Sequence, residues 1–126
     1  MTHREILESY MQAWQQKKTV SLGDFFTEDI YYSECYGPVY QGISEVEQWF
    51  EDWNQKGRVL DWTIQRVLEC GQTLVAQWTF SCDYDGQQEA FDGVTIADFR
   101  EKKMCRVLEY RSESQHTFPY RGKGLE

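Results

Sequence analysis

The feature that most constrains the fold is a strict alternation of apolar and more polar residues over Leu74–Tyr84, with the sequence LVAQWTFSCDY. A period of two predicts a β-strand with one buried face. The Asp85-Gly86 pair that follows is typical of a two-residue hairpin turn. We therefore expect an antiparallel partner at about Gln88–Arg100 and, after a charged turn at Glu101–Lys103, a last strand at about Met104–Ser112.

The first half of the chain has helical spacing instead. A T-x-x-E capping box at residues 2–5 precedes an apolar stripe that predicts a helix ending near Gln16–Lys18. A short second helix fits Ser21–Phe26. A second capping box at residues 44–47 predicts the start of a third helix, and Gly57 suits the position just past its end.

Two further strands are expected, at about Asp29–Cys35 and at Leu60–Leu68, where Leu60, Trp62, Ile64 and Leu68 alternate with mostly polar partners. Helices come first and strands last, which predicts an α+β fold with three N-terminal helices packed on a strongly curved antiparallel sheet. Aromatic residues make up 16% of the chain, with 5 Trp, 8 Tyr and 7 Phe. We expect these rings to line a conical space between helices and sheet, with simple filling of the core as the alternative.

Composition limits the remaining possibilities. A chain of 126 residues fits one domain, taken as residues 1–120, followed by a tail at 121–126 in which Leu125-Glu126 is either native sequence or a vector remnant. The net charge of −8 argues against nucleic-acid binding. No stretch predicts a signal peptide or a membrane span, so we expect a cytoplasmic protein.

The four cysteines lack ligand and disulfide spacing and are interpreted as small buried hydrophobes in a reducing compartment: Cys35, Cys70, Cys82 and Cys105. No cofactor motif is present, and His3 and His116 lie at opposite ends, so neither a cofactor nor a metal is expected.

Glu34 is the first candidate for chemistry, because it is a carboxylate between Tyr32 and Tyr36 just before the chain breaks at Gly37-Pro38. An anion among aromatic rings is costly to bury, so such a group either stays hydrated or has a raised pKa. Two interpretations follow: Glu34 points outward to solvent, or it lies at the mouth of an aromatic pocket.

Three segments, FFTEDIYYSECYGPVYQG, EVEQWFEDWNQKGRVLDW and FDGVTIADFR, together with the order of elements, resemble the nuclear transport factor 2-like superfamily and its SnoaL-like branch. The resemblance covers residues 2–120 and implies a cone-shaped α+β barrel. The superfamily includes delta-5-3-ketosteroid isomerase, polyketide cyclases, scytalone dehydratase and limonene epoxide hydrolase, and also many non-catalytic members. The fold therefore does not settle the function.

The resemblance to ketosteroid isomerases implies specific positions. Their base aspartate matches Glu34, and their oxyanion-hole tyrosine matches Tyr10 on the first helix. A base and a phenol donor that face each other across a dry pocket suit enolisation. Their second donor, a protonated aspartate, falls near Thr95, and a threonine hydroxyl is a poor substitute for it. This departure argues against steroid isomerisation.

Other acids are alternatives to Glu34. The alignment points Glu109, between Leu108 and Tyr110, toward the concave face. A pair of Glu34 and Glu109 would push their pKa values apart, giving one acid and one base. Asp92 adjoins Gly93, where a bulge could aim it inward, although an ion pair with an arginine is an equally ordinary role for it.

The sequence thus predicts a pocket for a small hydrophobic molecule, with isomerase or lyase chemistry or, alternatively, with binding or subunit association alone. The candidate catalytic residues are Glu34, Tyr10 and Glu109. The candidate ligand-binding residues are Trp14, Tyr32, Tyr36, Trp49, Trp53, Trp62, Trp78, Phe91, Thr95 and His116. His116 would fold over the mouth of the pocket, or else lie on the surface. The semi-polar face opposite Trp78, with Val94 and Ile96 on the neighbouring strand, predicts a homodimer through the outer face of the sheet.

Overall fold

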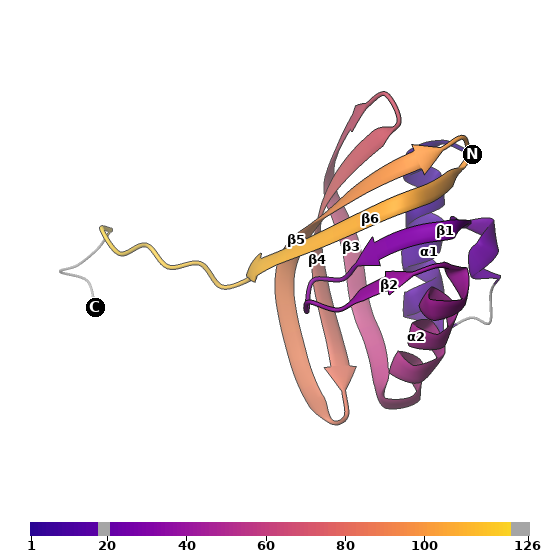
Figure 1. Ribbon diagram of the computed structural model, residues 1–126. Helices are drawn as coiled ribbons and strands as arrows, with labels where there is room; N and C mark the ends of the chain where they lie inside the picture. Colours follow the sequence, from indigo (N-terminus) through magenta and orange to yellow (C-terminus); the bar gives the residue numbers. More distant parts are fainter. Residues whose placement is uncertain (18–20, 122–126) are drawn as a thin grey trace.

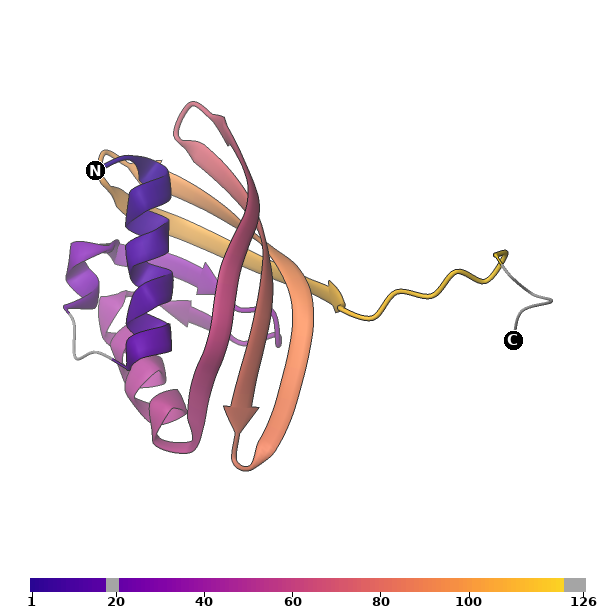
Figure 2. The ribbon, with the colours of Figure 1, turned by 180° about the vertical axis from the view of Figure 1, so that it is seen from behind.

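A six-stranded sheet curves around two helices in the computed structural model, which describes residues 1–17 and 21–121 (Figure 1). The fold is α+β, as predicted. Figure 2 shows α1 lying across the concave side of the sheet. In chain order the elements are α1 (His3–Gln16), the 3-10 turn η1 (Leu22–Asp24), β1 (Phe26–Ser33), β2 (Val39–Gln41), α2 (Ile43–Lys56), β3 (Gly57–Cys70), β4 (Thr73–Tyr84), β5 (Gln87–Arg100) and β6 (Lys103–Glu113).

The strands lie in the order β2-β1-β6-β5-β4-β3. The four long strands β3 to β6 form an antiparallel meander, as predicted, and β1 pairs antiparallel with β2. The expectation of an entirely antiparallel sheet is wrong, because β1 runs parallel to β6. The sequence of β1 indicates a strand but has no local signal for the direction of a partner from the other end of the chain.

The helices differ from the prediction in number. The capping box of α1 is confirmed, since the Thr2 hydroxyl accepts from the Glu5 amide at 3.1 Å and the Glu5 carboxylate accepts from the Thr2 amide at 2.8 Å. The expected second helix is only the turn η1, because the chain enters β1 at Phe26. The capping box expected at residues 44–47 is also wrong: α2 begins after Gly42, whose φ of 90° suits glycine.

The long strands position most of the rings. The alternation in β4 is confirmed, with Leu74, Ala76 and Trp78 all buried. In β3 the prediction of which side chains are buried is partly wrong. The register with β4 shifts between Val59 and Asp61 and again between Ile64 and Arg66, so the alternation of inward and outward side chains is interrupted there. As a result Leu60 and Leu68 are 41% and 55% exposed, whereas Val59 and Trp62 are buried.

The turn after β4 has the predicted hairpin conformation, since both Asp85 and Gly86 have positive φ, at 53° and 85°.

The cysteines are unpaired, and Cys82 is buried as expected, but Cys70 is exposed, so it is not a core residue. Beyond β6 the chain leaves the body of the fold as an extended segment (Figure 1). The expectations for residues 122–126 lie outside the described part of the chain.

The outer face of the sheet is partly apolar. Val75 pairs with Ile96, Ile96 pairs with Leu108, and Val94 pairs with Tyr110, so these side chains are neighbours on one surface. Tyr110 is 57% exposed, and the other four are partly exposed. Among the described residues, neither helix has the length and apolar character needed to cross a membrane.

Candidate functional site

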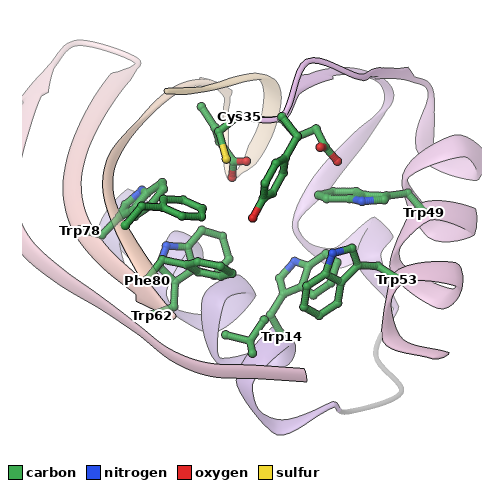
Figure 3. Close-up of a pocket in the computed structure, with 12 residues that line it drawn as sticks. Trp14, Cys35, Trp49, Trp53, Trp62, Trp78 and Phe80 are labelled. Carbon is green, nitrogen blue, oxygen red and sulfur yellow. The ribbon is translucent and has the colours of Figure 1, made fainter. Parts of the chain in front are cut away.

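Aromatic rings from both layers enclose a small inner cavity of about 50 Å³ (Figure 3). The rings of Trp49 and Trp53 on α2 lie opposite Trp62, Trp78 and Phe80 on the strands. The cavity has room for a few water-sized groups and is too small for a fused-ring ligand. Its lining consists of Trp14, Glu34, Cys35, Tyr36, Trp49, Trp53, Val59, Trp62, Trp78, Phe80, Phe91 and Glu109.

A larger outer cavity of about 830 Å³ adjoins the inner one. The two cavities share Glu34, Tyr36, Trp49 and Trp53, which therefore stand at the boundary between them. The volume of the outer cavity lies in the range of ordinary ligand sites. Its other lining residues are Tyr40, Glu45, Gln48, Asp52, Gln55, Lys56, Cys82, Tyr84 and Glu89.

Glu109, on β6, is a buried carboxyl group at the end of a chain of phenols. The Tyr32 hydroxyl donates to Glu109 Oε2 at 2.5 Å, and the Tyr10 hydroxyl donates to the Tyr32 oxygen at 2.8 Å. Burial raises the pKa of Glu109 to about 8, the charge of nearby Glu34 adds to the rise, and the bond from Tyr32 opposes it. Burial and the charge of Glu109 likewise raise the pKa values of Tyr10 and Tyr32 well above their ordinary value. At neutral pH, Glu109 is therefore a neutral carboxylic acid.

Glu34 follows β1 directly and is only 7% exposed, so it does not point outward to solvent. A turn holds it there: its amide donates to the Pro38 carbonyl at 3.1 Å, and Gly37 adopts a φ of +114°. The Tyr40 hydroxyl donates to Glu34 Oε2 at 2.9 Å. Burial raises the pKa of Glu34, and the bond from Tyr40 opposes that rise.

Tyr10 does not face Glu34 across the cavity. It is fully buried, its hydroxyl proton goes to Tyr32, and it lines neither cavity. Tyr32 likewise lies behind the lining and reaches the site only through Glu109. The phenols on the first helix and first strand therefore support a carboxyl group rather than contact a ligand.

Thr95 also lies outside the lining, with its hydroxyl accepting from the Trp78 indole nitrogen at 2.8 Å. In the register of β5 and β6, Thr95 is directly opposite Glu109. A neutral carboxyl group thus lies on the strand next to the position at which the resemblance implied one.

Two other predicted residues lie at the surface, away from the cavities. The exposed His116 ring contacts the Asp92 carboxylate at 3.3 Å, and neither residue is in the lining. The bulge suggested at Gly93 is absent, since the register through this residue is regular on both sides. Gly93 instead makes room for a ring: a Cβ atom there would lie 2.2 Å from Trp78.

Several lining residues were not singled out from the sequence. Tyr40 is the most informative, because it bonds Glu34 and stacks on Trp49 with ring centroids 4.7 Å apart. The pairing of Tyr32 with Tyr40 in the β1–β2 hairpin places it there, and the Gly37-Pro38 turn was the signal for that hairpin. Glu45 and Asp52 on α2 and Glu89 on β5 gave no such signal, because exposed acids on helices and strands are ordinary.

The family model described as "SnoaL-like domain" matches residues 7–107, which is most of the chain. The chain belongs to the SnoaL-like domain family. No curated protein matches the sequence. The family match agrees with the resemblance found in the sequence.

Solved structures show the same fold at low identity. One is a protein with a ketosteroid isomerase-like fold from Catenulispora acidiphila in complex with trimethylamine, 20% identical, with a TM-score of 0.76 over 88% of each chain. An epoxide hydrolase from M. tuberculosis, described as LEH-like, is 11% identical, with a TM-score of 0.77 over 87% of this chain and 82% of that chain. A protein from Pseudomonas putida, provisionally described as a polyketide cyclase, is 19% identical, with a TM-score of 0.73 over 89% of this chain and 92% of that chain.

Proposed function

We propose that this SnoaL-like domain binds a small molecule and moves a proton on it without a cofactor, as an isomerase or lyase. The observation that carries the proposal is the pair of carboxyl groups in one aromatic cavity, Glu109 with a pKa of about 8 and the less enclosed Glu34. Two carboxyl groups whose environments push their pKa values apart can act as an acid and a base.

In this mechanism Glu34 is the base. It stands where the two cavities meet, so a ligand that enters from the outer cavity reaches it first. Its carboxylate removes a proton from carbon next to a carbonyl group, and Tyr40 holds one of its oxygens. A raised pKa makes Glu34 a stronger base than a solvated carboxylate.

Glu109 is the acid that stabilises the developing enolate. Its Oε2 atom accepts from Tyr32, which leaves the proton of the neutral acid on the other oxygen, where it can be donated to a ligand oxygen. The phenol chain from Tyr10 through Tyr32 positions this group and does not itself meet the ligand. The small volume of the inner cavity limits the reacting part of the ligand to a compact group.

The test is exchange of α-protons for deuterium in a set of small cyclic ketones and enones, followed by NMR in D₂O. We expect exchange above background with the natural protein and none with Glu34→Gln. Glu109→Gln should reduce the rate by about 10²–10³-fold, as for loss of one oxyanion donor. Glu113→Gln, which changes an exposed glutamate on the same strand, is the matched control and should leave the rate unchanged. Exchange that survives Glu34→Gln would contradict this assignment.

Binding without turnover is the second candidate. It is favoured by Tyr10, whose hydroxyl is committed to Tyr32 and so offers no free phenol donor to a ligand. Mass spectrometry of molecules that co-purify with the protein would identify the ligand in either case. We propose a cytoplasmic location, which the interpretation of the four cysteines as thiols of a reducing compartment supports.

A further inference from the structure

The sizes of the two cavities indicate a ligand with two parts. The inner cavity of about 50 Å³ accepts a compact reacting group, whereas the outer cavity of about 830 Å³ is large enough for the rest of the molecule. The chemistry of the outer walls therefore selects the part of the ligand that does not react.

Carboxylates dominate the outer walls. In the described part of the chain, this lining contains Glu34, Glu45, Asp52 and Glu89 and a single cation, Lys56. Glu89 is neutralised by Arg111, whose Nη1 lies 2.7 Å from Glu89 Oε1. Among the described ion pairs, none involves Glu34, Glu45 or Asp52.

Glu34 is the decisive member of this set, because it is more than nine-tenths buried and still lacks a cationic partner among the described residues. Its carboxyl group accepts only from neutral donors, the Tyr40 hydroxyl and the Tyr36 backbone amide. A buried charge is ordinarily paired, so an unpaired carboxylate that faces a cavity is a site for a positive charge from outside the chain.

Five aromatic residues also line the outer cavity: Tyr36, Tyr40, Trp49, Trp53 and Tyr84. Tyr40 and Trp49 stack with an interplanar angle of 16°, and Trp53 packs against Tyr84 with centroids 5.3 Å apart. Tyr36 completes the boundary with the inner cavity. The faces of such rings attract cations whose substituents are apolar, and trimethylammonium groups are the usual occupants of such aromatic sites.

We propose that the outer cavity binds an organic cation, an ammonium group with apolar substituents held between aromatic faces and the carboxylates of Glu34 and Asp52. This deepens the proposed function, because it assigns a positive charge to the substrate whose compact group reaches Glu109. A bare metal ion does not fit as well, since among the described residues no three His, Cys, Asp or Glu side chains are grouped so that they could hold one. An anionic ligand is disfavoured, because Glu34, Glu45 and Asp52 have no ion-pair partner among the described residues.

The test compares two probes of nearly identical shape. Choline carries a trimethylammonium group, and 3,3-dimethylbutan-1-ol replaces its nitrogen with carbon and so removes the charge. Binding is measured by isothermal titration calorimetry and by tryptophan fluorescence at low ionic strength. We expect choline to bind at least about tenfold more tightly than the neutral alcohol. Equal affinities, or no saturable binding of choline, would overturn the proposal.

Substitutions test whether choline binds at this site. Glu34→Gln keeps the acceptor for Tyr40 while it removes the charge, and should lower the affinity for choline about tenfold with little change for the alcohol. Asp52→Asn, at an exposed position of α2, should lower it about twofold to threefold and serves as the second variant if Glu34→Gln does not fold. The matched control is Glu51→Gln, an exposed acid on α2 outside the lining, which should have no effect. An equal loss with Glu51→Gln would refute a local site, because it would show that only net charge matters.

This experiment and the deuterium exchange of neutral ketones fail independently. Preference for choline with no exchange in any ketone, including a ketone that carries a trimethylammonium group, would sustain the cation site and refute proton transfer. Exchange in neutral ketones with equal affinity for the two probes would sustain proton transfer and refute the cation site.

Discussion

Replacement of Glu109 by glutamine should make the stability of the protein less dependent on pH. The fold accommodates this buried carboxyl group in its neutral form, with a pKa of about 8 instead of the ordinary 4.5. Its favourable contribution is therefore complete below about pH 4.5 and is lost as the pH rises toward and through 8. The rise in pKa corresponds to about 5 kcal/mol in total, of which about 4 kcal/mol falls between pH 5 and pH 9.

That loss is a large part of the 5–15 kcal/mol that stabilises a typical domain. Glutamine has the same shape and can still accept from Tyr32, but it cannot ionise. We expect the variant and the natural protein to be similarly stable near pH 5, with the variant more stable by several kcal/mol at pH 9.

The assay is urea unfolding at pH 5, 7 and 9, followed by fluorescence of the five tryptophans. Glu113→Gln is the control, because it makes the same substitution at an exposed position of β6 and should leave the pH dependence unchanged. Parallel curves for the natural protein and Glu109→Gln would refute the reasoning, since they would mean that Glu109 titrates alike in the folded and unfolded states.

Three further outcomes are expected. Tyr32→Phe should destabilise the fold by about 1–3 kcal/mol, because it leaves buried polar groups without a hydrogen-bond partner. It should also raise the pKa of Glu109 further, as measured by carboxyl NMR titration. A lowered pKa of Glu109 would contradict the role given to Tyr32. Gly93→Ala should cost about 1–3 kcal/mol in urea unfolding because the new methyl group meets the Trp78 ring, and an unchanged midpoint would count against that contact. We propose that the outer sheet face forms a homodimer, so analytical ultracentrifugation at micromolar protein should give about twice 15.0 kDa, and Ile96→Lys should give a monomer; a monomeric natural protein would refute this.

Local patterns in the sequence were sufficient for much of the fold. The period of two in β4 and the capping box of α1 involve neighbouring residues, and both predictions are confirmed. The parallel pairing of β1 with β6 and the register shifts in β3 depend on contacts distant in sequence, which such patterns do not encode. The unexpected exposure of Leu60 and Leu68 follows from those shifts.

The candidate site, too, could be predicted only in part from the sequence. Glu34 and Glu109 were recognisable as acids among apolar neighbours, and the structure brings both to one cavity. The partner of each could not be predicted, because Tyr40 depends on the β1–β2 hairpin and Tyr32 depends on the β1–β6 pairing. A tyrosine pattern alone does not show which phenol faces a ligand and which lies behind a carboxyl group.

The parallel pairing of β1 with β6 has a consequence for how the protein is made. Ser33 is opposite Leu108 in this pairing, so Glu34 and Glu109 become neighbours only when the first and last strands of the sheet meet. A ribosome releases β1 long before it has synthesised β6. During that interval Glu34 has neither β6 beside its strand nor Glu109 near it, because Glu109 is itself part of β6. The pair of carboxyl groups can thus form only after β6 has been made, and any chain cut short before β6 lacks it.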